Sequence, residues 1–366
     1  MAPPGPPSSS PADEPSEDPA DGGAPRLHVV TGKGGTGKTT LAVALAVALA
    51  DEGRRVLLCE VEGRQGLARL LGTAELPYEE VEVAEGAGGG QVVGLAVEPR
   101  AALLDYLDTF HGGVLGGRGR GGRASAVLDR AGAVDVIATV APGLRDVLLI
   151  GKVYEAVLRT TTARGGSSAT GTPVYDAVVL DAPPTGRITR FLGIGAELAQ
   201  LAGGGPIAGR AASVAALLTS PRTAVHLVSL LEELPVTETA EAAAELSEAG
   251  LPLGAVVANR ALPGSSALPA APDDAVARAL RGVLGEVLDE APGASPDVED
   301  DLVAALVTQN RRRTAQVREQ ERWRTGLEAL GRPVRSLPDL PGGVDLDGLY
   351  RLADHLVASP LLGSAR

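Results

Sequence analysis

The stretch TGKGGTGKTT, residues 31–40, decides the fold, because Gly32 to Thr39 contains the complete pattern G-x-x-x-x-G-K-[ST]. It follows the apolar run RLHVV and precedes LAVALAVALA, which is typical of a buried helix. A glycine-rich turn between a strand and a helix directs backbone N–H groups and the positive end of the helix dipole at a phosphate. The stretch therefore predicts a phosphate-binding loop in an α/β nucleotide-binding fold.

The same motif assigns chemistry to particular residues. Lys38 is expected to reach the β- and γ-phosphates, and the Thr39 hydroxyl is expected to ligate Mg²⁺. The loop is expected to hold the nucleotide with Gly34, Gly35, Thr36, Gly37, Lys38, Thr39 and Thr40.

Composition supports a close-packed, water-soluble fold. Hydrophobic residues make up 44% of the chain but aromatic residues only 2%, and small aliphatic side chains suit helices packed on a sheet. The net charge of −13 argues against non-specific electrostatic binding of nucleic acid, so no nucleic acid partner is expected. The one cysteine, Cys59, excludes an internal disulfide and any multi-cysteine metal site within a single chain.

The chain is expected to be cytoplasmic. Its N-terminus lacks the charged-then-apolar order of a signal peptide, and no uncharged apolar run reaches the length of a membrane span. Residues 1–25 are rich in proline, serine and acidic residues, so they are predicted to form a disordered tail.

From Arg26 onward, short apolar runs alternate with helix-like runs. Strands buried on both faces lose strict alternation of polar and apolar residues, so the pattern predicts a mostly parallel, twisted sheet flanked by helices. The predicted strands are 26–30, 54–60, 89–98, 175–181, 223–230, 253–260 and 333–340. One P-loop domain is expected over 26–360, with helical insertions at about 99–165, 186–220 and 261–330, the last ending in a long polar helix.

A second anchor is the stretch YDAVVLDAPPTGRITRFL, residues 175–192. An apolar strand ends at Asp181 and is followed by a Pro/Gly turn. This position brings a carboxylate beside the phosphates, where it can hold a water bound to Mg²⁺. Asp181 is therefore predicted to belong to both the catalytic and the metal site.

Lys33 carries a resemblance to a known class. The chain has only three lysines, and two of them lie in this loop. The pattern G-K-G-G-x-G-K-[ST] resembles the deviant P-loop of the ATPases that include MinD, ParA, nitrogenase iron protein and the ArsA-type anion pumps. That resemblance implies that Lys33 crosses a dimer interface and contacts the phosphates held by the opposite subunit. The alternative is a loop cation acting on its own nucleotide.

The switch region narrows the resemblance to the ArsA/Get family of ATPases, whose sequence there is D-T-A-P-T-G-H-T-L-R. The chain departs from it at Ala182, Pro183 and Arg187. Arg187 either reads the phosphate state or pairs with an acid. The resemblance spans residues 27 to about 357 and implies an ATPase that binds ATP and Mg²⁺.

Glu62 occupies the place of the family's aspartate in D-P-A, so the resemblance implies that Glu62 orients or activates the attacking water. Glutamate is one methylene longer than aspartate, and Glu60 is a competing candidate. The alternative is that both residues are surface carboxylates at a strand end, without a catalytic role.

Nucleotide selectivity is also implied by the resemblance. Asn259 matches the family's strand-end asparagine, whose amide can pair with the adenine edge and favour ATP. The stretch LPDLPGG resembles the adenine loop and implies contacts from Pro338 and Leu340. Glu238 lies at a helix start that matches the family's E-T pattern.

The partners implied are other ATPase subunits. The metalloid-binding cysteines and the C-x-x-C pairs of a zinc clasp are absent from the sequence, so no structural zinc is expected. These departures resemble the cysteine-poor actinobacterial branch, which implies a heterodimer with a paralogous ArsA-like subunit, or else a homodimer. A protein client or membrane partner is also implied. Lys152 either touches a partner subunit or lies exposed on a helix.

Two other functions stay open. One is a MinD/ParA-like positioning ATPase. A MinD-like protein would need a basic amphipathic C-terminal helix, whereas residues 345–366 are nearly charge-balanced and are expected to pack on the sheet. A ParA-like protein would need a basic patch, which the net charge disfavours. The second open function is a nucleotide-binding scaffold with weak or lost hydrolysis. It stays open because Glu62 and Arg187 depart from the family pattern.

Overall fold

The computed structural model describes residues 24–61, 63, 65–111, 142–161, 171–201, 206–263, 272–288 and 296–358. Within these ranges, one sheet of eight strands has the order β3-β4-β2-β5-β1-β6-β7-β8. Every neighbouring pair is parallel except β3 and β4. This is the α/β architecture of a P-loop NTPase, so the predicted fold class is confirmed.

The strands form where the sequence has short, mostly apolar runs. Each predicted strand has a counterpart, with ends that shift by a few residues. Their bounds are β1 (Leu27–Gly32), β2 (Arg55–Glu60), β3 (Val81–Glu85), β4 (Gln91–Ala96), β5 (Ala177–Asp181), β6 (Thr223–Leu230), β7 (Leu253–Ala261) and β8 (Val334–Pro338).

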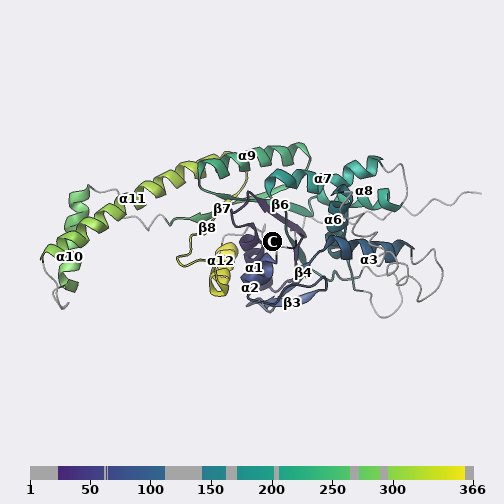
Figure 1. Ribbon diagram of the computed structural model, residues 1–366, viewed down its shortest axis with the longest axis horizontal. Helices are drawn as coiled ribbons and strands as arrows, with labels where there is room; N and C mark the ends of the chain where they lie inside the picture. Colours follow the sequence, from purple (N-terminus) through teal and green to yellow (C-terminus); the bar gives the residue numbers. More distant parts are fainter. Residues whose placement is uncertain are drawn as a thin grey trace, which may run out of the picture.

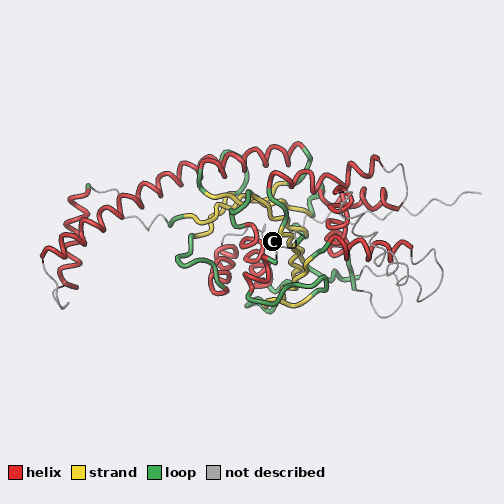
Figure 2. Tube along the Cα trace, viewed as in Figure 1, coloured by secondary structure: helices red, strands yellow, loops and turns green. Residues whose placement is uncertain are grey.

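Helices cover both faces of this sheet (Figures 1 and 2). One face packs against α1 (Lys38–Asp51), α2 (Gly66–Leu71) and α12 (Leu346–Ala358). The other packs against α3 (Pro99–His111), α6 (Pro142–Leu158), α7 (Thr185–Leu201), α8 (Pro206–Leu218) and α9 (Glu233–Glu248). The C-terminal helix α12 lies beside α1 and contacts β8, within the core on this face of the sheet, as expected for a segment that packs on the sheet.

The central helix α1 is buried on all sides, which explains its uniformly apolar sequence. Residues 41–50 of α1 are all buried. A helix that is apolar all round belongs in the interior of a domain. The strand that feeds it, β1, is buried over its whole length, so the phosphate-binding loop is carried by two rigid elements.

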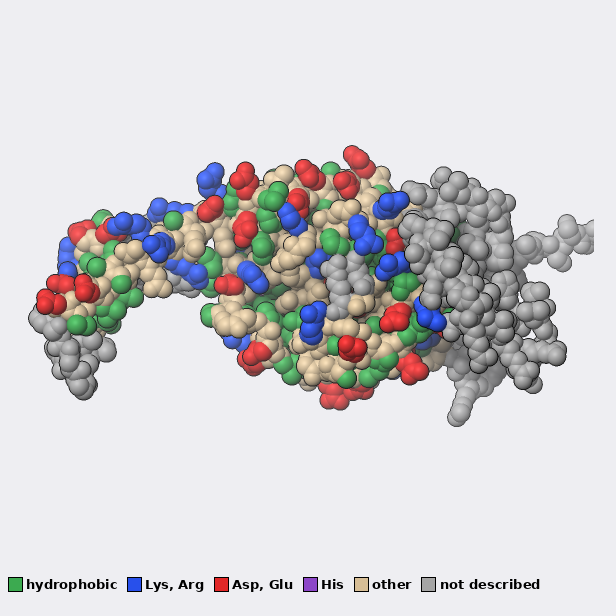
Figure 3. All heavy atoms as spheres, in the orientation of Figure 1, with side chains coloured by type: hydrophobic (Ala, Val, Ile, Leu, Met, Phe, Trp, Pro, Cys, Tyr) green, Lys and Arg blue, Asp and Glu red, His purple; other side chains and the backbone are tan. Residues whose placement is uncertain are grey.

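The third insertion forms an arm. Helix α11 (Pro296–Glu328) packs its C-terminal part on α9 and β8, while its other end extends away from the sheet and carries α10 (Asp273–Leu288) (Figure 1). A small core of Val276, Val303 and Val307 joins the two helices. Basic and acidic side chains both lie on the visible face of the arm (Figure 3). The predicted long polar helix is therefore present.

The sequence interpretation missed β3. Its residues VEVAE alternate, and they are only partly buried because β3 is the edge strand and pairs with β4 alone. Several predicted features lie outside the described residues. They are most of the N-terminal tail, residues 112–141 and 162–165 of the first insertion, residues 202–205 of the second, and residues 264–271 and 289–295 of the third. In the described ranges, no helix combines the length and apolar composition that crossing a bilayer requires.

Two histidines are buried together in the sheet. The His28 ring on β1 stacks on that of His226 on β6 with 5.4 Å between centroids, and Nδ1 of His28 lies 3.1 Å from Nε2 of His226. The backbone N–H of Ala255 donates to Nδ1 of His226 at 3.2 Å, so that nitrogen is an acceptor and Nε2 carries the proton. Burial lowers the pKa of His28 to about 3 and the pKa of His226 to about 4.

This pair predicts a loss of stability in mild acid. Because both pKa values lie below the unfolded value of 6.5, the unfolded state binds more protons between pH 6.5 and about 4. The free energy of unfolding should fall as pH drops through this window, by up to about 1.4 kcal/mol per pH unit for each histidine. Urea unfolding at several pH values measures this slope. In the double variant His28→Leu, His226→Leu, the free energy of unfolding should depend less steeply on pH. An unchanged pH dependence would contradict the assignment of this effect to the two histidines.

Candidate functional site

The phosphate-binding loop runs from the end of β1 into α1, at the carboxyl edge of the parallel strands. The Lys33 carbonyl accepts from Thr36 Oγ1 at 2.9 Å and from Lys38 Nζ at 3.3 Å, which folds the loop back on itself. Gly35 has φ +87° and Gly37 has φ +96°, values that suit glycine. A Cβ on Gly37 would also lie 2.2 Å from Nδ2 of Asn259, so side chains are excluded there. The loop has the curvature of a phosphate cradle, with Lys38 only 8% exposed.

The predicted metal-site residues lie together. Thr39 Oγ1 donates a hydrogen bond to Oδ2 of Asp181 at 2.8 Å, although the two are 142 positions apart in sequence. Asp181 ends β5, and its neighbour β1 leads directly into the loop. A hydroxyl and a carboxylate are oxygen ligands of the kind that Mg²⁺ prefers. Within the described residues no cluster of three or more His, Cys, Asp or Glu could hold a metal alone. Two protein oxygens fit Mg²⁺, which usually keeps several waters and takes phosphate oxygens of the bound nucleotide.

Lys33 does not point into its own loop. Its Nζ donates to Oε1 of Glu238 in α9 at 2.6 Å, and both side chains are about one third exposed, at 32% and 31%. The ion pair joins the loop to the first turns of α9. The sequence indicated Glu238 only as a helix-start residue, and no local signal shows that it meets a residue 205 positions away.

Asn259 lies beside the loop, as a nucleotide-reading residue should. Its Nδ2 donates to the Thr36 carbonyl at 2.8 Å, and its Oδ1 accepts from the Arg260 N–H at 2.9 Å. These bonds use one N–H and one lone pair, and a carboxamide has a second of each. The carboxamide thus fixes the loop to β7 and retains the donor–acceptor pair that an adenine edge requires.

The residues expected to contact adenine also lie at this edge. Pro338 is the register partner of Ala261, two residues beyond Asn259. Leu340 follows β8 and packs against the core that contains α1. A cavity of about 350 Å³ opens nearby, with Ala261 and Leu262 on one side and Gln320 and Arg324 of α11 on the other.

The two candidate carboxylates after β2 differ in what the structure describes. Glu62 lies outside the described residues, so its predicted role stays a prediction. Glu60, the last residue of β2, is buried at 3% exposure, so the alternative that it is a surface carboxylate is wrong. Its Oε2 accepts the N–H of Leu67 in α2 at 3.1 Å. Glu60 is also the register partner of Asp181 on the neighbouring strand.

Lys152 lies in the first insertion, away from the loop. Its Nζ pairs with Asp105 at 3.0 Å and lies 5.4 Å from the centroid of the Tyr78 ring. This contact ties α6 to α3 within one chain, and no sequence pattern indicates it. Arg187 belongs to the switch stretch and is exposed in the first turn of α7. Its role stays a prediction.

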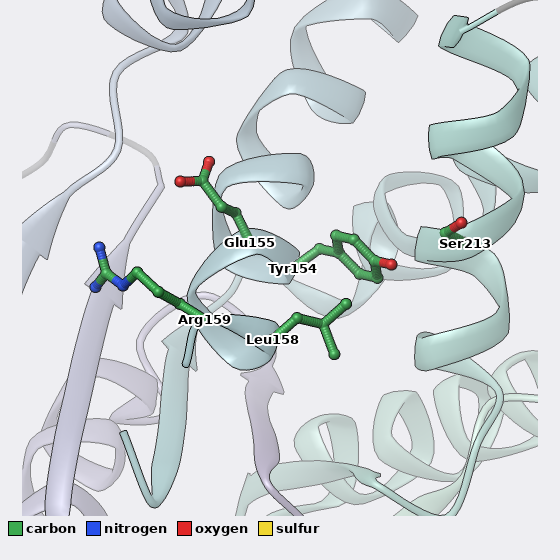
Figure 4. A pocket seen from close by; sticks show the side chains of 5 residues that line it. All are labelled: Tyr154, Glu155, Leu158, Arg159 and Ser213. Atoms are coloured by element: carbon green, nitrogen blue, oxygen red, sulfur yellow. The ribbon is translucent and has the colours of Figure 1, made fainter. Parts of the chain in front are cut away.

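A second cavity, of about 330 Å³, lies between α6 and α8, outside the loop region. Figure 4 shows the Tyr154 ring extending toward the helix that carries Ser213, whereas Arg159 points to the opposite side. Arg159 is held there by an ion pair with Glu80. Cys59 is buried and burial raises its pKa to about 12, so this thiol is suited to packing rather than chemistry.

Comparison with known proteins places the site in a family. Residues 27–358 match the CobQ/CobB/MinD/ParA nucleotide binding domain. The chain is 44% identical to ATPase BagA of Mycobacterium tuberculosis over 333 residues, which cover 90% of this chain and 92% of BagA.

More distant similarity extends to the ATPases that the motifs resemble. The chain is 26% identical over 260 residues to the arsenical pump-driving ATPase of Escherichia coli, covering 65% of this chain and 40% of that protein. It is 26% identical over 208 residues to ATPase GET3 of Lachancea thermotolerans, covering 56% and 55%. The chain therefore belongs to the CobQ/CobB/MinD/ParA family of nucleotide-binding domains, with the ArsA and GET3 ATPases as distant relatives.

Proposed function

We propose that this protein is a Mg²⁺-dependent ATPase that works as a dimer of ATPase subunits. The observation that carries the proposal is the hydrogen bond between Thr39 and Asp181 at the mouth of a complete phosphate-binding loop. A loop that only fixed the fold would not need a hydroxyl and a carboxylate from distant segments at this point. The partner subunit is either a paralogous ArsA-like chain or a second copy.

Each residue has a distinct task in this proposal. The loop backbone from Gly34 to Thr40 holds the phosphates, and Lys38 leaves the Lys33 carbonyl to contact the β- and γ-phosphates. Thr39 and Asp181 hold the ion, directly or through water. When bound, Mg²⁺ neutralises charge on the phosphate oxygens. Asn259, Pro338 and Leu340 contact the base.

Hydrolysis also needs a positioned water and a cation for the transferring phosphoryl group. Glu62 is assigned to orient the water, on the strength of its place after β2. Lys33 is assigned to the phosphates of the opposite subunit, where a cation stabilises the charge of the transition state. To do so Lys33 must leave Glu238, so catalysis would be coupled to the meeting of two subunits. The resemblance to ArsA/Get ATPases alone supports coupling to a client or membrane partner.

Phosphate release by the Lys38→Ala variant tests the proposal. Lys38 is the loop cation for the phosphates, so its loss should lower the steady-state rate by about 10²-fold or more. Wild type and variant are assayed with ATP and Mg²⁺, alone and with the paralogous subunit, and equal melting temperatures show that the variant folds. Equal rates for the two proteins under both conditions would favour a scaffold without hydrolysis.

A further inference from the structure

Glu60 has a buried carboxylate oxygen that the fold leaves unused. Its Oε2 accepts the Leu67 N–H at 3.1 Å, whereas its Oε1 has no hydrogen-bond partner among the described residues. The side chain is 97% buried, since its exposure is 3%. A buried carboxylate is costly unless it is paired with a cation or holds a metal. The uncompensated oxygen indicates that Glu60 has a positively charged ligand in the working protein.

The position of Glu60 shows where that ligand lies. Glu60 and Asp181 are register partners on adjacent parallel strands, so their side chains lie on the same face of the sheet. Two residues earlier on each strand, Leu58 and Val179 belong to the core that contains α1. Both carboxylates therefore face the helix that starts at the phosphate-binding loop and bears Thr39.

Gly66 provides an independent measure of this closeness. A Cβ placed on Gly66 would lie 3.6 Å from Oγ1 of Thr39 and 3.9 Å from Oε2 of Glu60. The Thr39 hydroxyl itself donates to Asp181 at 2.8 Å. The Thr39 hydroxyl and the Glu60 carboxylate therefore both border Gly66, so one small region contains a hydroxyl and two carboxylates from neighbouring strands.

A purely structural role accounts for only one of the two carboxylate oxygens of Glu60. Accepting the Leu67 N–H at the start of α2 needs one oxygen, and a neutral side chain would serve as well. That role does not explain why a second carboxylate oxygen is buried without a partner, on the face of the sheet that Glu60 shares with Asp181.

We propose that Glu60 completes the magnesium site by holding, through its Oε1, a water molecule bound to the ion. This inference rests on the proposed function and assigns the ion a further carboxylate. Mg²⁺ usually keeps several of its waters, and carboxylates that hold those waters orient the ion and strengthen its binding. Glu60 is therefore a positioning residue, distinct from Glu62, to which the attacking water is assigned.

The test measures the binding of Mn²⁺ to the full-length protein in complex with ADP. Electron paramagnetic resonance gives the concentration of free Mn²⁺ at each point of the titration. Glu60→Gln keeps the side-chain volume and an acceptor for the Leu67 N–H but removes the charge. Its Kd for Mn²⁺ should rise by about 10-fold or more, as expected for a carboxylate that holds a metal-bound group. ADP binding in EDTA should stay the same or tighten. The control is Glu85→Gln, an exposed carboxylate on β3, which should bind Mn²⁺ like wild type.

Three outcomes separate the possibilities. Wild-type Mn²⁺ affinity in Glu60→Gln would overturn the inference while leaving the proposed function intact. A lower melting temperature of nucleotide-free Glu60→Gln would also overturn it, because removing an uncompensated buried charge should leave the apo protein as stable or more so. Failure of the wild type to bind ADP with or without Mn²⁺ would instead refute the proposed function itself.

Discussion

The Lys33→Ala variant is expected to hydrolyse ATP about 10³-fold or more slowly than wild type, the loss seen when a cation supplied in trans is removed from a phosphoryl-transfer site. Nucleotide binding should persist, because the cradle and Lys38 stay in place. The ion pair between Lys33 and Glu238 at 2.6 Å holds the ammonium away from its own loop, so a role on its own phosphates does not follow from this geometry. Phosphate release at saturating ATP and Mg²⁺ measures the effect.

Lys152→Ala is the matched control for this prediction. It removes the one lysine that lies outside the loop, which pairs with Asp105 in the first insertion. Lys33→Arg should not restore the rate, because a planar guanidinium fork differs in shape and hydration from a compact ammonium. If Lys33→Ala keeps a rate within a few-fold of wild type, Lys33 has no role in catalysis.

The Asp181→Asn variant is expected to lower hydrolysis by about 10²-fold or more, because it removes the charge that supports the ion beside Thr39. In the wild type, the Thr39 hydroxyl lies 2.8 Å from Oδ2 of Asp181. Asparagine keeps the shape of this side chain and an oxygen that can accept the same hydrogen bond. The loss should therefore come from the metal site rather than from misfolding. The measurement is the rate of phosphate release as a function of Mg²⁺ concentration, in which the midpoint should move upward.

Asp176→Asn provides the control, next to the opposite end of β5. Asp176 precedes β5 and accepts the Arg55 N–H at 2.8 Å, at the opposite end from the loop. Its replacement should leave the Mg²⁺ midpoint unchanged. An Asp181→Asn protein with the wild-type midpoint and rate would contradict the placement of the ion.

The features that the sequence predicts are those set by local pattern. The motif from Gly32 to Thr39 requires a strand before it and a helix after it, and an apolar run that ends at Asp181 requires a strand whose carboxyl end faces the loop. These constraints determine the layers of the sheet and the meeting of Thr39 with Asp181. The edge strand β3 was missed because packing on one side only leaves it half exposed.

The features that the sequence does not predict depend on which distant segments of the chain come into contact. The pairing of Lys33 with Glu238 needs α9 to pass beside the loop, and no residue near Lys33 indicates this. The sequence predicts Asn259 as an adenine contact. Its hydrogen bond to the Thr36 carbonyl, however, depends on where the end of β7 lies beside the loop. Likewise, the sequence shows a carboxylate at Glu60 but not that one of its oxygens is buried without a partner.

Mixing two inactive variants tests the central claim most directly, namely that Lys33 serves the nucleotide of the opposite subunit. Lys33→Ala retains a nucleotide site but lacks the cation, and Lys38→Ala supplies the cation but lacks a functional site. In an equimolar mixture half of the random dimers hold one complete centre, so the rate should recover to about one quarter of wild type. A mixture as inactive as its two components, at a concentration where wild type alone is active as a dimer of identical chains, would contradict the account.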